Sequence, residues 1–160
     1  MDALQPILTF AHSLLRWLLL LFLIQALLKA VPGWLNDRSW RDSDDAVGRR
    51  LTMTADLQLL LGLALYAFSP SVRTAMADMA GAMKNAALRF WAVEHASLML
   101  LAVIFIHIGR ARSRRKGPSD RVRHRRAAIG FGLALLAILL AMPWPWLAEN
   151  ARPYLPSLPF

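Results

Sequence analysis

"RFWAVEHASLMLLAVIFIHIGR", residues 89–110, is apolar over nearly its whole length and long enough to cross a lipid bilayer as a helix. The stretch nevertheless contains Glu94, His95 and His107. A charged side chain at the bilayer centre costs roughly 2.5–3.5 kcal/mol on insertion scales, so such residues normally face the interior of a helix bundle and pair there or mark a functional site. The stretch therefore predicts a membrane helix with a polar face turned toward other helices.

The other apolar residues of the chain are also gathered in blocks. The chain has 160 residues, of which 57% are hydrophobic, and they do not alternate with polar residues as in a soluble domain. A membrane helix needs about 20 largely apolar residues. Four blocks meet this length, at about 6–30, 51–68, 90–108 and 127–147. We therefore predict one all-α domain over 1–160, an antiparallel bundle of four transmembrane helices.

The segment 71–89 is too polar to span a membrane. Its Met76, Met79 and Met83 recur near helical spacing, which predicts a short amphipathic helix lying on the outer surface. A methionine stripe of this kind can bind a soft metal, but more often it packs against apolar neighbours.

The positive charge predicts the orientation in the membrane. The formal net charge is +9, with nine basic residues in 109–126, five in 29–50 and three in 69–89. By the positive-inside rule, the first two segments are cytoplasmic and both termini lie outside. We therefore expect a multi-pass membrane protein whose basic loop contacts anionic lipid headgroups. Nucleic acid is not an expected partner, because no aromatic residues are interleaved with the basic ones.

Five polar or small residues are predicted to share one depth in the outer leaflet. His12 lies about two turns into the first helix, and Arg16 follows it on the same face. Glu94 and His95 lie about two turns into the third helix, and Gly62 of the second helix falls at a similar level. An ion pair between Arg16 and Glu94 would allow both charges to exist inside the bundle.

The two histidines at matched depth are candidate metal ligands. The chain has no cysteine, so iron–sulfur clusters and disulfides are excluded. Imidazole suits iron, copper and zinc, and a lone ion would need further ligands, of which only Glu94 is at hand. Haem needs only two axial ligands, here His12 and His95, with Gly62 leaving room for the ring and Arg89 placed to meet a propionate.

The remaining polar residues have structural interpretations. His107 lies about 18 Å along the helix from His95, near the cytoplasmic end, where we expect it to contact Asp56 of the second helix. His124 falls in the basic loop and is expected to be solvated. Three further residues are expected to form hydrogen bonds between helices: Thr52, Thr54 and Gln58.

Several short segments resemble those of a known group of proteins. They are "HSLLRW" (12–17), "DLQLLLGLALYAFSP" (56–70), "EHASLML" (94–100), "HIGR" (107–110), "MPWPW" (142–146) and "RPY" (152–154). In this order they resemble small bacterial four-helix membrane proteins catalogued as cytochrome b-like. The resemblance implies a b-type haem and membrane electron transfer, with His12, Glu94 and His95 as the residues carried over. A membrane quinol or a respiratory complex is the redox partner that it suggests.

Two other functions are consistent with the same residues. In the first, the chain is a non-catalytic subunit or scaffold of a larger membrane complex, and its polar residues hold the helices together. In the second, it is a small metal-handling protein that uses His12, His95, Glu94 and the methionine stripe.

Overall fold

The protein is all-helical over the residues that the computed structural model describes, which are 4–115, 117–146 and 150–154. Four of its helical segments are long and apolar enough to cross a membrane, as the sequence predicts. They are α1 (Leu4–Leu35), α2 (Asp42–Phe68), the continuous segment Ala86–Ser113, and α7 (Asp120–Ala141). The third segment consists of α5 (Ala86–Arg89), the π-helical turn η1 (Phe90–Glu94) and α6 (His95–Ser113).

The ends of the helices differ from the ends of the apolar blocks in the sequence. α2 begins at Asp42 rather than near residue 51, because Asp44 accepts a hydrogen bond from the backbone N–H of Arg41 at 2.8 Å and caps the helix. Three aspartates in its first turn also favour the positive end of the helix dipole. α7 ends at Ala141 rather than near residue 147, because Pro143 and Pro145 follow and cannot continue a helix.

The single surface helix predicted over 71–89 is wrong. The segment instead forms α3 (Pro70–Ala77), α4 (Met79–Ala82) and α5, which continues into the third long segment. Asp78 accepts a hydrogen bond from the Gly81 N–H at 2.9 Å, and Asn85 accepts one from the Leu88 N–H at 3.0 Å. Such side chains compete with the helix for backbone groups and start new helices instead.

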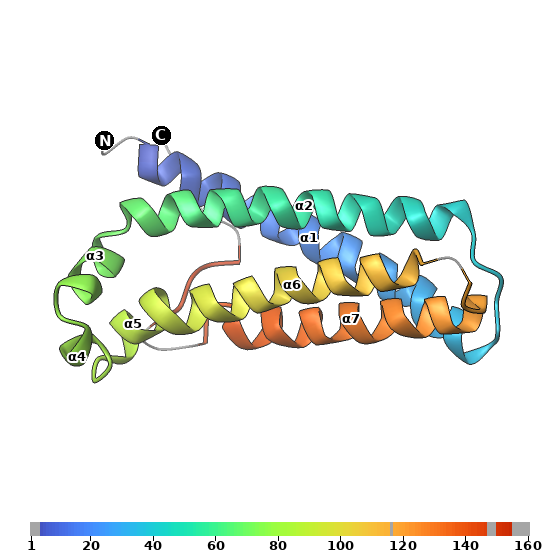
Figure 1. The fold of residues 1–160 in the computed structure, drawn as a ribbon. Coiled ribbons are helices and arrows are strands. Elements are labelled where there is room, and N and C mark those ends of the chain that lie inside the picture. The colour runs from blue at the N-terminus through green and yellow to red at the C-terminus, as the bar shows by residue number, and fades with distance from the viewer. Residues whose placement is uncertain (1–3, 116, 147–149, 155–160) are drawn as a thin grey trace.

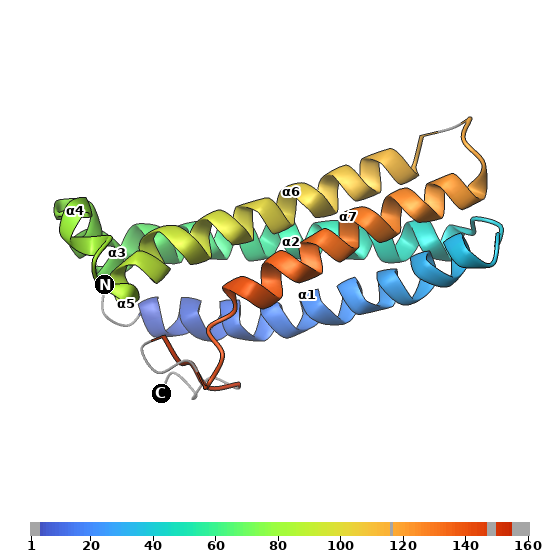
Figure 2. The ribbon, with the colours of Figure 1, turned by 90° about the horizontal axis from the view of Figure 1, so that it is seen from below.

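The four long helices pack around a common interior (Figures 1 and 2). α1 packs on α2 and α7, while α6 packs mainly on α7 and along a shorter stretch on α2. α1 and α6 are therefore diagonal partners across the bundle. The short helices α3, α4 and α5 gather at the end where α1 begins, and the connections α1–α2 and α6–α7 lie at the opposite end.

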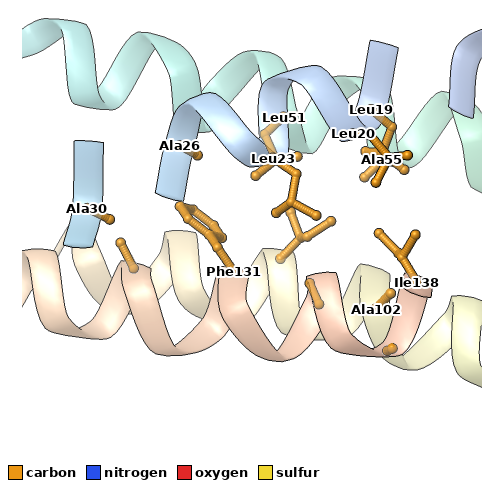
Figure 3. Packing of buried hydrophobic residues seen from close by; sticks show 14 of the residues in the cluster. Leu19, Leu20, Leu23, Ala26, Ala30, Leu51, Ala55, Ala102, Phe131 and Ile138 are labelled. Carbon is orange, nitrogen blue, oxygen red and sulfur yellow. The ribbon is translucent and has the colours of Figure 1, made fainter. Parts of the chain in front are cut away.

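The apolar core occupies mainly the half of the bundle next to those connections. Leu23, Leu51 and Ile106 are fully buried there, with Phe131 of α7 against them (Figure 3). α6 and α7 approach each other closely at Gly109 and Gly130, where a β-carbon on Gly130 would lie 2.5 Å from the Cα of Gly109. Small residues permit such close backbone contact between membrane helices.

Candidate functional site

The opposite half of the bundle is packed much less tightly. Among the described residues, none of α1 before Leu19, of α2 after Ala55 or of α6 before Ala102 is buried within the protein. Of the four long helices, α7 keeps buried residues there, through Ile138 and Ala141, and a small cluster of Ala75, Ala82 and Ala92 lies among the short helices and η1. The five residues predicted to share one depth lie in this loosely packed half, which makes it the candidate site: His12, Arg16, Gly62, Glu94 and His95.

His95 is the first residue of α6 and follows directly after the π-helical turn. π-helical turns of this kind are frequent at functional sites. The Nδ1 atom of His95 lies 2.8 Å from the carbonyl oxygen of Ala141 in α7. A carbonyl oxygen can only accept a hydrogen bond, so Nδ1 donates, and in the neutral ring Nε2 keeps a free lone pair. The indole of Trp91 packs near the same imidazole, at 5.5 Å between ring centroids.

His12 is held from the other side by α2. The Nε2 atoms of His12 and Gln58 are 3.1 Å apart, and the same amide nitrogen donates to the His12 carbonyl oxygen at 3.1 Å. Gly62 lies one turn further, where a β-carbon would come within 3.3 Å of the imidazole. The Nδ1 atom of His12 is buried and has no hydrogen-bond partner. Gly62 thus makes room for the His12 ring.

His12 and Arg16 lie in the first half of α1, and His95 is the first residue of α6, so all three belong to the same end of the bundle. That the two histidines face each other at one depth stays a prediction.

The predicted ion pair between Arg16 and Glu94 is wrong. Glu94 instead accepts from the Nε of Arg89 at 2.6 Å, and Arg89 also donates to the carbonyl oxygen of Met83 at 3.0 Å. The two residues are five positions apart, and the i to i+5 spacing of the π-helical turn brings them to one side. This pair is therefore formed within one segment, at the rim of the site.

Arg16 is engaged by the C-terminal segment. Its Nη2 donates to the carbonyl oxygen of Tyr154 at 3.1 Å, and the Trp17 Nε1 donates to the same oxygen at 2.8 Å. The guanidinium of Arg152 lies over the ring of Trp91, at 5.2 Å from its centroid. Residues 150–154 therefore fold back over α1 and η1 at the open end of the bundle. The sequence did not predict that residues 150–154 would contact α1 and η1. The only indication was the tyrosine in this segment and the tryptophans that precede it.

The histidines outside the site have separate roles. His107 contacts Asp56 at 2.7 Å, which confirms that prediction. The solvated position predicted for His124 is wrong, because its side chain is fully buried against Gly33 and packs at a tilt against the ring of Trp40, with 4.8 Å between the ring centroids. α7 begins earlier than the sequence indicated, so His124 belongs to a helix and faces α1.

Of the three residues expected to form hydrogen bonds between helices, one does so and two do not. Gln58 forms one, to His12. Thr52 and Thr54 bond instead to backbone carbonyl groups of their own helix, at Gly48, Arg49 and Arg50, where a hydroxyl can satisfy itself locally. The methionines Met76, Met79 and Met83 are exposed.

Comparisons with models of protein families, with curated proteins and with solved structures found no match to this chain.

The two imidazoles of the site differ in how well they would fit as axial ligands of a haem. His95 fits as an axial ligand, because its Nδ1 contact with Ala141 orients the ring and leaves Nε2 free. His12 offers no free lone pair in this arrangement, because the Gln58 amide nitrogen donates to Nε2 and the proton of the neutral ring is then on Nδ1. Gln58 would have to release Nε2 before His12 could act as a ligand. Within the described residues, no three side chains of His, Cys, Asp or Glu gather as a metal site would need. A haem needs fewer protein ligands than a lone metal ion, because two axial histidines are sufficient.

Proposed function

We propose that the protein is an integral membrane cytochrome b-like electron carrier that holds one haem between His12 and His95. The observation that carries the proposal is the coincidence of two features in one half of the bundle. That half has almost no buried side chains on α1, α2 and α6, and it contains both histidines on diagonal helices. Cofactor sites in helix bundles are built from side chains on facing helices in this way.

The chain's own residues would bind and orient the group. The carbonyl oxygen of Ala141 fixes the His95 tautomer, as outer hydrogen-bond partners of ligating histidines generally do. Arg16 brings a positive charge close to both imidazoles, which favours the reduced, less positive state of a bound metal centre. Gly62 leaves space beside His12, and Arg89 with Glu94 closes the rim. A bound haem would supply one-electron redox chemistry.

We further propose how the bundle lies in a bacterial inner membrane. The four helices cross it as an antiparallel bundle, with the strongly basic connections in the cytoplasm and both termini outside. The short helices α3–α5 then lie on the outer surface, and the exposed Met76, Met79 and Met83 side chains meet the membrane interface. The haem site faces the outer leaflet, where a membrane quinol or a respiratory complex can exchange electrons with it.

The absorption spectrum of the purified protein tests the haem proposal. Protein produced with ample haem should show the sharp reduced bands of a low-spin bis-histidine haem. His95→Ala should abolish these bands or convert them to a high-spin form, and His12→Ala should do the same. His107→Ala is the matched control, because it removes an imidazole from the same helix as His95 at the opposite end of the bundle, and it should leave the bands unchanged.

Two results would overturn the proposal. One is a colourless protein, and the other is loss of the spectrum in His107→Ala alone. A colourless, folded protein would favour the second candidate function, a non-catalytic subunit of a larger complex. In that case a helix of another subunit would cover the exposed apolar side chains of the loosely packed half, which include Leu14, Leu18 and Leu63.

A further inference from the structure

A polar pocket opens between α2 and α6 at the opposite end of the bundle from the candidate haem site. Its volume is about 210 Å³, and it is open to the surroundings. The pocket is lined by Thr52, Asp56, His107, Arg110, Ala111 and Arg114. No function has been assigned above to this pocket, whose walls contain two arginines and a His–Asp pair.

The donors in the pocket are arranged for an anion. Arg110 is fixed by one hydrogen bond, from Nη1 to the carbonyl oxygen of Asp45 at 3.1 Å, and a guanidinium has five N–H groups to offer. Arg114 has a side chain that is 62% exposed and only a long contact of 3.9 Å with the Asp45 carboxylate. The one carboxylate in the pocket wall, Asp56, is engaged by His107. Arg110 and Arg114 therefore keep N–H groups that can bind phosphate oxygens in a bidentate manner.

An exposed apolar track continues from the pocket toward the middle of the bundle. Leu60 and Leu63 follow Asp56 at helical spacing on α2, and they are 64% and 56% exposed. Leu100 and Ile104 precede His107 at the same spacing on α6, and they are 49% and 42% exposed. α2 and α6 run side by side here (Figure 1). A basic pocket above a lipid-facing apolar track matches a molecule with an anionic head and a hydrocarbon tail.

We propose that this pocket binds the phosphodiester headgroup of an anionic glycerophospholipid, with Arg110 and Arg114 on the phosphate and an acyl chain along the track. The headgroup region of the bilayer lies at this level if the four helices span the membrane, and basic pockets between helices on the cytoplasmic side bind lipid headgroups in this way. The track distinguishes a lipid from free phosphate, which would gain nothing from apolar contacts. This inference depends on the helices spanning the membrane but not on a bound haem. A colourless protein that binds the lipid would therefore contradict only the haem proposal, and a coloured protein that does not bind it would contradict only this inference.

Native mass spectrometry of the full chain in detergent tests this inference. Short-chain phosphatidylglycerol, phosphatidylcholine and inorganic phosphate are the probes, each titrated separately. Phosphatidylglycerol should bind at a single tight site, and the double variant Arg110→Gln/Arg114→Gln should bind it at least about tenfold more weakly, because each charge-assisted hydrogen bond is a strong one. Arg112→Gln is the matched control for the single variant Arg114→Gln, since each removes one arginine charge from the same exposed helix end. Arg112 does not line the pocket, so Arg112→Gln should bind as the unmodified chain does, whereas Arg114→Gln should bind more weakly. If the double variant fails to fold, Arg114→Gln alone supplies the comparison, because this exposed side chain contributes little to packing.

Three results would overturn the inference. Equal weakening by Arg112→Gln would mean that diffuse surface charge, rather than the pocket, attracts the lipid. Equal affinity for phosphatidylcholine would exclude an anionic headgroup as the ligand. Displacement of phosphatidylglycerol by inorganic phosphate at equal concentration would show that the apolar track contributes nothing.

Discussion

Replacing Gly130 with alanine should push α6 and α7 apart. The new β-carbon would lie 2.5 Å from the Cα of Gly109, 2.9 Å from its backbone nitrogen and 2.9 Å from the carbonyl oxygen of Phe105. Carbon atoms pack best at about 3.5–4.0 Å, so the two helices must separate by about 1 Å. All three obstacles are backbone atoms, which cannot rotate away as a side chain would. Overpacking of this kind typically costs about 1–3 kcal/mol of stability.

Gly132→Ala provides the matched control for this prediction. It makes the same chemical change two residues along α7, where a β-carbon would meet no atom within 4 Å. There alanine should only improve helix propensity, by up to about 1 kcal/mol. The gain in helix propensity is common to both variants, because both glycines lie inside α7. Unfolding by added dodecyl sulfate from a mild detergent, followed by tryptophan fluorescence, should therefore place Gly130→Ala about 1–3 kcal/mol below Gly132→Ala. Equal stability of the two variants would refute the close helix contact at Gly109.

Three further predictions follow from other contacts. Both side chains of the Arg89–Glu94 pair are partly exposed. A double-mutant cycle in detergent should therefore give a coupling free energy below about 1 kcal/mol. A coupling of several kcal/mol would show that the pair is shielded from water. Gly33→Ala should destabilise the protein, because its β-carbon would overlap the imidazole of His124. Adding His124→Ala should recover part of the lost stability. If the free-energy changes of the two substitutions simply add in the same unfolding assay, the contact is contradicted. A cysteine at Ser119, in a chain that otherwise has none, should resist an impermeant thiol reagent in intact cells and react after permeabilisation, and labelling in intact cells would reverse the proposed orientation.

The amino-acid sequence was sufficient to predict the class of fold and the helices that can span a membrane. Long apolar blocks carry this information because a bilayer demands about 20 apolar residues per helix, and no tertiary contact is needed to recognise them. The same argument from depth along each helix predicted the contact of His107 with Asp56. Distance along a helix follows from residue number alone, so these features were determined before any packing was known.

The partners of the polar groups were decided only by the tertiary structure. The sequence could not show that Glu94 would bind Arg89 rather than Arg16, because that choice depends on a π-helical turn which changes the spacing of side chains. Nor could it show that residues 150–154 would return to Arg16, or that His124 would be buried against Gly33. These contacts join segments far apart in the chain, and their geometry is set by how the helices cross and where each one begins, which hydrophobicity and spacing along a single helix do not specify.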